Sequence, residues 1–163
     1  MGQKRRSRGV SLSAWLMIVI NASSLLSALD TKYYSACYAS FPAVLVSFLA
    51  GYSFLFSVVG ITAGAGLLAL KEAARKAAIF INAADILVGL PVFILSFSSV
   101  RSHIYVLTAS QLAQGPPSLD AGMVATAAFD FVVFMNLAVF ALNGAFIFFF
   151  TRRKIKEQFA AAS

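Results

Sequence analysis

The chain has few of the residues that carry metal, disulfide and redox chemistry. Its 163 residues include one cysteine, Cys37, and one histidine, His103. A single cysteine makes no disulfide within the chain and no redox pair. Structural zinc takes about four cysteine or histidine ligands, and a bis-histidine haem takes two histidines. We therefore expect no cofactor and no metal.

Charge is also scarce, because charged residues make up 12% of the chain and hydrophobic residues 60%, with a mean hydropathy of +0.85. Soluble domains are about half apolar and a quarter charged. The composition predicts a membrane protein of one domain, whose first partner is the lipid bilayer. A net charge of +7 would suit nucleic acid, but no basic face interleaved with aromatic residues accompanies it. We expect no nucleic-acid partner.

Most basic residues fall in three short clusters, each beside an apolar segment, as cytoplasmic anchors do. Placing all three clusters on one side of the membrane leaves only Lys32 and Arg101 on the other. The clusters therefore predict four helices with both chain ends in the cytoplasm. The anchors beside the helices are Arg5, Arg6, Lys71, Arg75, Lys76, Arg152, Arg153 and Lys154.

Four apolar segments are long enough to cross a hydrocarbon core of about 30 Å. We expect helices over about 10–29, 42–70, 77–98 and 122–150, with basic tails at 1–9 and 151–163. The predicted fold class is an all-α membrane protein, an antiparallel bundle of four transmembrane helices. Residues 1–28 also suit a signal peptide, because small residues precede Asp30. The length of this apolar run and Asn21 within it favour a retained helix.

The segments between the expected helices differ in length. The charged turn 71–76 makes a hairpin of the second and third helices, and 99–121 is expected to be an outer loop with at most one short helix or strand. In the third helix, Pro91 leaves the carbonyl of Leu87 without its usual partner, which predicts a kink. Tyrosines in 30–41 predict an aromatic belt, with a ligand-binding aromatic patch as the alternative.

The second apolar segment carries a stripe of small residues, Ser53, Ser57, Gly60 and Gly64, spaced 4, 3 and 4 residues apart. At about 100° per residue these side chains share one narrow face of a helix. Small residues on such a face let another helix approach closely. We expect packing within the chain, with a homo-oligomer interface as the alternative.

Polar residues interrupt the apolar segments at similar depths. Asp85 lies about 12 Å, Asn143 about 10 Å and Asn21 about 16 Å from the basic ends of their helices. With Asn82, which shares a face with Asp85, they make a candidate polar cluster. Three interpretations compete: hydrogen bonds that hold helices together, a proton or cation relay through Asp85, and a contact with another membrane subunit.

Two further polar residues, Asp130 and Asn136, lie in the last segment. Asp130 falls in its outer half and points more than about 100° away from Asn136. We therefore expect the two intramembrane carboxylates, Asp85 and Asp130, to belong to different places.

Two charged stretches carry a family resemblance. Residues 67–79 read LLALKEAARKAAI, and residues 150–159 read FTRRKIKEQF. The first resembles the hairpin turn, often KEWARK, of small bacterial four-helix inner-membrane proteins, with Ala73 in place of tryptophan. The second is similar to their Thr-Arg-x-x-Val-Lys-Glu-x-Phe ending. The resemblance implies a bacterial inner-membrane location and a four-helix plan, and it implies no activity.

No serine stands in a nucleophile motif, and no glycine loop suits a phosphate, so we expect no enzyme. The sequence favours a non-catalytic accessory, scaffold or assembly subunit, working through helix packing in a homo-oligomer or a larger membrane complex. The alternative is a small transporter or channel subunit that uses Asp85 as a protonatable site.

Overall fold

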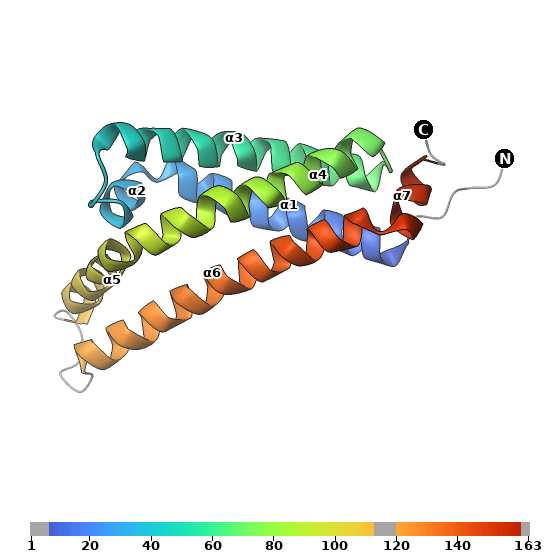
Figure 1. The fold of residues 1–163 in the computed structure, drawn as a ribbon. Helices are drawn as coiled ribbons and strands as arrows, with labels where there is room; N and C mark the ends of the chain where they lie inside the picture. Colours follow the sequence, from blue (N-terminus) through green and yellow to red (C-terminus); the bar gives the residue numbers. More distant parts are fainter. Residues whose placement is uncertain (1–6, 113–119, 161–163) are drawn as a thin grey trace.

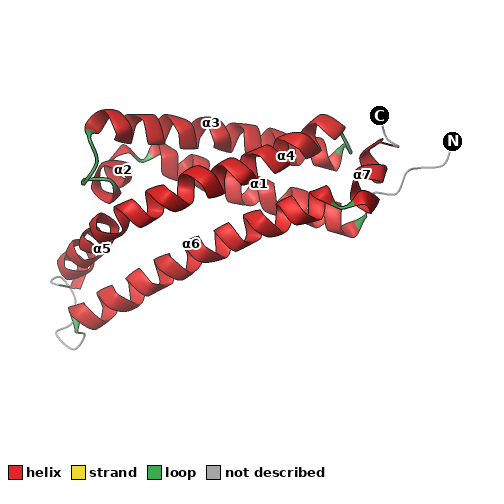
Figure 2. Ribbon diagram, in the orientation of Figure 1, coloured by secondary structure: helices red, strands yellow, loops and turns green. Residues whose placement is uncertain are grey.

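The computed structural model describes residues 7–112 and 120–160, which are almost entirely helical and contain no strand (Figure 2). Four helices in these ranges are long and apolar enough to cross a membrane, as the sequence predicts. They are α1 (Arg8–Leu29), α3 (Ala43–Leu68), the continuous helix Glu72–Leu112 and α6 (Ala121–Thr151). Two short helices, α2 (Thr31–Cys37) and α7 (Arg153–Ala160), complete the described fold.

The continuous helix Glu72–Leu112 differs most from expectation. It is made of α4 (Glu72–Ala84), a π-helical turn η1 (Asp85–Gly89) and α5 (Leu90–Leu112). The prediction that 99–121 is a loop was wrong for its first 14 residues, because no proline or glycine interrupts them and they continue α5. The predicted turn at 115–118 lies outside the described residues.

The third apolar helix also begins earlier than expected. The charged segment 71–76 is not a turn, because α4 starts at Glu72, whose carboxylate suits a helix N-terminus. The chain reverses over the preceding residues, where Leu70 adopts a positive φ of 54°. The N–H of Lys71 reaches back to the carbonyl of Gly66 at 3.0 Å and so caps the end of α3.

The long helices pack in chain order (Figure 1). Helix α1 lies along α3, α3 against α4, and both α4 and α5 against α6. The start of α1, the α3–α4 turn and α7 all lie at one end of the molecule, which we call the basic end. Towards the opposite, far end, α5 and α6 diverge from α1 and α3, and α2 lies there beside α3 and α5.

The main hydrophobic core lies at the basic end. Val10 of α1, Leu67 of α3, Ala78 of α4 and Phe150 of α6 are completely buried in it. Helix α7, which falls in the segment expected to be a tail, folds back onto this core. Its buried side chains Ile155 and Phe159 are four residues apart, so one face of this charged helix is apolar.

The small-residue stripe of α3 faces α1. A Cβ atom at Gly60 would collide with the side-chain amide of Asn21, and one at Gly64 would lie 2.6 Å from Cγ1 of Ile18. Ser57 is also buried, whereas Ser53 is half-buried. The stripe therefore serves packing within the chain, because its glycines let α1 and α3 approach closely.

The predicted anchors lie at the basic end, where Lys71, Lys76, Arg152, Arg153 and Lys154 are exposed. Arg5 and Arg6 lie outside the described residues. Arg75 differs from the rest, because its side chain is buried and its guanidinium binds both carboxylate oxygens of Glu72, at 2.7 and 2.5 Å. It also donates to the backbone carbonyl of Phe150 at 2.8 Å, which joins the start of α4 to the end of α6.

Candidate functional site

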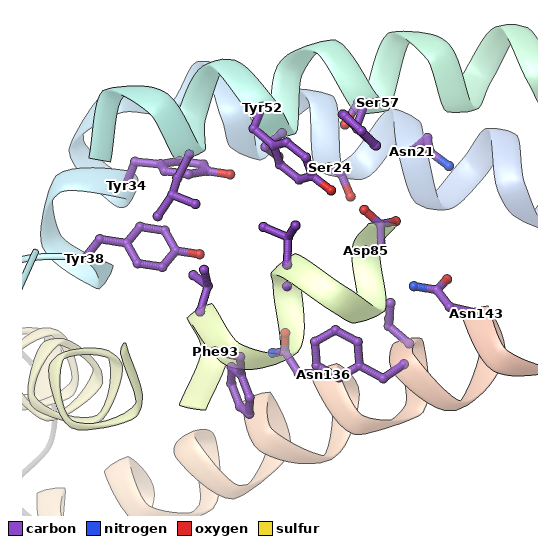
Figure 3. Close-up of a pocket in the computed structure, with 18 residues that line it drawn as sticks. Asn21, Ser24, Tyr34, Tyr38, Tyr52, Ser57, Asp85, Phe93, Asn136 and Asn143 are labelled. Atoms are coloured by element: carbon purple, nitrogen blue, oxygen red, sulfur yellow. The ribbon is translucent and has the colours of Figure 1, made fainter. Parts of the chain in front are cut away.

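A cavity of about 250 Å³ lies between the four long helices, on the far side of the main core (Figure 3). It is lined by three of the four residues of the predicted polar cluster, Asn21, Asp85 and Asn143, and by Asn136 of α6. Hydroxyl groups complete its polar lining: Ser24 of α1, Tyr34 and Tyr38 of the α2 segment, and Tyr52, Ser53 and Ser57 of α3.

Asp85 stands at the first position of the π-helical turn, about a third of the way along the helix Glu72–Leu112. The sequence predicted a distortion just beyond the polar residues, because Pro91 has no N–H to donate. The structure has a π-helical turn over Asp85–Gly89, which begins at Asp85, includes Leu87 and ends two residues before the proline. A π-helical turn widens the helix locally and re-aims its side chains, and such turns are frequent at functional sites. The Asp85 carboxylate points towards α1 and α3 (Figure 3).

Three of the asparagine side chains bond within their own helices. Asn21 donates to the carbonyl of Met17 at 2.8 Å, and Asn136 donates to the carbonyl of Val132 at 2.9 Å. Asn82 is buried, donates to the carbonyl of its own helix four residues earlier at 2.6 Å, and does not line the cavity. Across 7–112 and 120–160, no hydrogen bond joins two polar-cluster side chains from different helices.

Two polar groups at the cavity are buried without a hydrogen-bond partner in the described structure, Nδ2 of Asn143 and the hydroxyl of Tyr52. Buried polar groups in proteins nearly always have a partner, and those without one require an explanation. Because both groups line the same cavity, a molecule inside it is a natural partner for them.

The α2 segment closes the cavity with two tyrosine rings, whose centroids are 5.3 Å apart. Burial, with smaller contributions from the nearby Tyr34 and Cys37, raises the pKa of Tyr38 to about 12. Burial also raises the pKa of Tyr34, against the opposing effect of its hydrogen bond with Ser53. Both side chains are therefore neutral phenols at physiological pH, and their hydroxyls point into the cavity (Figure 3).

The remaining wall of the cavity is aromatic and aliphatic. The rings of Tyr52 and Phe56 are stacked with centroids 4.1 Å apart, and Phe93 of α5 approaches Phe140 of α6 with centroids 6.3 Å apart. All four rings line the cavity, and none of its lining residues is a lysine, arginine or histidine. Asp85 is therefore the only carboxylate in an otherwise uncharged, largely aromatic lining.

Asp130 lies elsewhere, as expected. It is exposed on α6, next to Phe129, whose ring lies 5.9 Å beneath the guanidinium carbon of Arg101. Nearby, the hydroxyl of Tyr105 lies 2.6 Å from the hydroxyl of Thr126, which links α5 to α6. Asp130 does not line the cavity.

The sequence did not identify the tyrosines as part of the same site as Asp85. The sequence predicts an interfacial aromatic belt for the tyrosines in 30–41, with a ligand-binding aromatic patch as the alternative, and does not connect them with Asp85. The signal that distinguishes the two is the spacing of four residues between Tyr34 and Tyr38, which puts both rings on one face of the short helix α2 and its extension. Tyr52 gave no signal, because it lies in a continuous apolar run.

In the part of the chain that the structure describes, no group of three or more histidine, cysteine, aspartate or glutamate side chains is placed to hold a metal ion. The described residues are thus almost entirely helical, with four helices that are long and apolar enough to cross a membrane and a polar cavity between them. Comparisons with protein-family models, curated proteins and solved structures found no match to this chain.

Proposed function

We propose that the chain is a multi-pass protein of the bacterial inner membrane, an antiparallel four-helix bundle with both ends in the cytoplasm. The clustering of exposed lysines and arginines at the basic end supports this orientation, because cytoplasmic borders of membrane proteins are rich in these residues. The two charged stretches that resemble bacterial inner-membrane proteins support the location.

We further propose that the protein is a small transporter or channel subunit, not an enzyme, and that Asp85 is its protonatable site. The observation that carries this proposal is the polar cavity around Asp85. Side chains that serve only to hold helices together would bond across helices, whereas these asparagines bond within their own. An ionisable residue beside a cavity inside a membrane domain is typical of proton and substrate pathways.

Proton movement into proteoliposomes tests this function. Purified protein is reconstituted with a trapped pH-sensitive dye, and protons are driven inward by a potassium diffusion potential or by an outward gradient of a test cation. We expect uptake above that of empty liposomes, its loss in Asp85→Asn, and its retention in Asp130→Asn. Uptake that is absent under both driving forces, or that Asp85→Asn leaves intact, contradicts the proposed function.

A second candidate is the accessory, scaffold or assembly subunit. A groove between α3 and α4 near the basic end favours it, because the groove is lined mainly by alanine and glycine, including Ala63, Gly66, Ala73 and Ala77. Small side chains at a helix surface allow a further membrane helix to approach. Purification in mild detergent followed by intact mass spectrometry tests this candidate. Recovery of the chain alone, as a monomer, contradicts it.

A further inference from the structure

We propose that the cavity binds a small organic ammonium ion, with Asp85 as its counter-charge and tyrosine and phenylalanine rings as its walls. The inference names the substrate class of the proposed transporter or channel subunit and therefore rests on that function. Four features of the cavity support it: its charge, its walls, its size and its unpartnered polar groups.

The charge of the lining selects for a cation. Asp85 is the only ionisable acid among the lining residues apart from the tyrosines, which are neutral phenols, and no basic side chain faces it there. The α1, α3 and α6 walls present only amides, hydroxyls and apolar groups, such as Asn21, Ser57 and Asn143. A half-buried carboxylate inside a membrane domain, without a basic partner, is best compensated by a positively charged ligand or by a proton.

The walls favour an ammonium over other cations. Six aromatic rings line the cavity, from α2, α3, α5 and α6: Tyr34, Tyr38, Tyr52, Phe56, Phe93 and Phe140. The face of an aromatic ring attracts an ammonium electrostatically, and several rings around one site are a recurrent way to bind quaternary ammonium groups. The hydroxyls of Tyr34, Tyr38 and Tyr52 point into the space that Asp85 borders (Figure 3).

The size and donor set argue against a bare metal ion. Calcium takes six to eight oxygen ligands and magnesium requires a near-octahedral set, whereas this cavity offers one carboxylate among neutral amides and hydroxyls. No metal-binding group of side chains occurs in 7–112 and 120–160. A volume of about 250 Å³ suits a small organic molecule better than a single ion.

The unpartnered groups suggest that the ligand also carries oxygen. Nδ2 of Asn143 is a hydrogen-bond donor, and the hydroxyl of Tyr52 both donates and accepts. An ammonium alone would satisfy neither donor. A hydroxyl or carbonyl oxygen on the ligand would accept from them, so a hydroxylated ammonium such as choline fits the site better than tetramethylammonium.

Isothermal titration calorimetry on the full chain in mild detergent tests the inference with a matched pair of ligands. Choline is compared with 3,3-dimethylbutanol, in which carbon replaces the charged nitrogen. We expect choline to bind at least about tenfold more tightly than its neutral isostere, and more tightly than tetramethylammonium. This comparison uses the unmodified chain and does not depend on any variant folding. Equal binding of choline and the isostere, or no saturable binding of either ammonium, overturns the inference.

Variants locate the binding. We expect Asp85→Asn to weaken choline binding by about thirtyfold or more, because the ligand loses its counter-charge. Asp130→Asn removes the other intramembrane carboxylate, which lies outside the cavity, and should leave binding unchanged. If the two variants weaken binding equally, the site is not at Asp85 and the inference fails.

The aromatic walls have their own pair of variants. Tyr38→Leu should weaken choline binding by about three- to thirtyfold, whereas Tyr38→Phe, which keeps the ring, should change it by less than about threefold. Tyr105→Leu, a ring outside the cavity, is the control and should have no effect. Weaker choline binding by Tyr38→Phe than by Tyr38→Leu would contradict a role for the ring.

The outcomes separate this inference from the proposed function. If no ammonium binds while proteoliposomes still show proton uptake that depends on Asp85, the ligand class is wrong and the proposed function stands. If choline binds through Asp85 but neither protons nor choline cross the membrane, the ligand class stands and the transport function is wrong.

Discussion

The basic end and the far end of the molecule are packed differently, although helices of similar hydropathy run through both. At the basic end one continuous core includes completely buried side chains such as Val10, Ala78 and Phe150. At the far end two separate small clusters form, one around Leu49 and one around Phe129, and the cavity lies between these clusters and the main core.

Similar apolarity therefore does not decide by itself how closely these helices pack. In the basic half Gly60 and Gly64 let α1 and α3 approach closely. Towards the far end large rings, such as Tyr38, Tyr52 and Phe93, line a cavity. Close packing therefore fixes one half of the molecule, and the other half is left with a polar site.

Arg75→Ala should destabilise the protein most. The substitution removes the buried guanidinium that joins Glu72 to the carbonyl of Phe150, and it leaves both acceptors without their partner. We expect the free energy of unfolding, measured by titration with sodium dodecyl sulfate, to fall by about 2–4 kcal/mol. Arg153→Ala is the control, because Arg153 pairs with Glu157 on an exposed surface. Loss of this pair should change the free energy of unfolding little. Similar effects of the two variants would refute the special role of Arg75.

Gly64→Ala tests the close approach of α1 and α3. The added Cβ would lie 2.6 Å from Cγ1 of Ile18 and 3.0 Å from the backbone oxygen of Ala14, so the helices must separate. We expect a loss of about 1–3 kcal/mol in the same titration. Gly51→Ala, on the same helix, meets nothing within 4 Å and should be neutral or slightly stabilising. Equal stability of the two variants would show that the stripe is not a packing face.

Stability should fall at high pH through Tyr38 at the far end. Burial raises the pKa of Tyr38 to about 12, whereas an unfolded chain loses the phenol proton near pH 10. The folded state therefore holds the proton more tightly, and stability is lost as the pH rises from about 10 to about 12. We expect the free energy of unfolding of Tyr38→Phe to fall by about 1–2 kcal/mol less over this pH range than that of the unmodified chain. Below pH 9 the two should be equally stable. An unchanged pH profile in Tyr38→Phe would mean that Tyr38 is accessible to water.

Tyr52→Phe should have the smallest effect on stability. The hydroxyl of Tyr52 is buried without a partner, so its removal costs no hydrogen bond in the described structure. We expect unchanged stability or a gain of up to about 1 kcal/mol. The same variant should weaken choline binding relative to tetramethylammonium, because the hydroxyl contacts the oxygen of the ligand. A clear loss of stability without ligand would show that the hydroxyl has a structural partner.

The sequence predicted those parts of the fold that depend on long apolar runs. The four apolar helices follow from runs of about 20 residues or more, and the role of Gly60 and Gly64 follows from their helical spacing. The end of α5 could not be predicted in the same way. Polar residues such as Arg101 and His103 occur both in loops and on helices that project beyond a membrane, and only the tertiary structure distinguishes the two.

The site was predicted in part. Helix rise per residue places Asn21, Asp85 and Asn143 at similar depths, and all three line the cavity. Asn82 was grouped with Asp85 because a spacing of three residues puts both on one helix face, yet of the two only Asp85 lines the cavity, and Asn136 lines it as well. The hydrogen bonds also required the structure. An asparagine that bonds within its own helix cannot be told from one that joins two helices by its position in the sequence.

The central claim is that Asp85 belongs to a site and does not hold the helices together. The free energy of unfolding of Asp85→Leu, measured without ligand, tests this claim most directly, because leucine fills a similar volume but makes no hydrogen bond. A site residue is dispensable for folding, so we predict unchanged or higher stability, because leucine avoids the cost of removing an unpaired carboxylate from water. A fall of about 2 kcal/mol or more in the free energy of unfolding would contradict this interpretation and would show that Asp85 has a structural role.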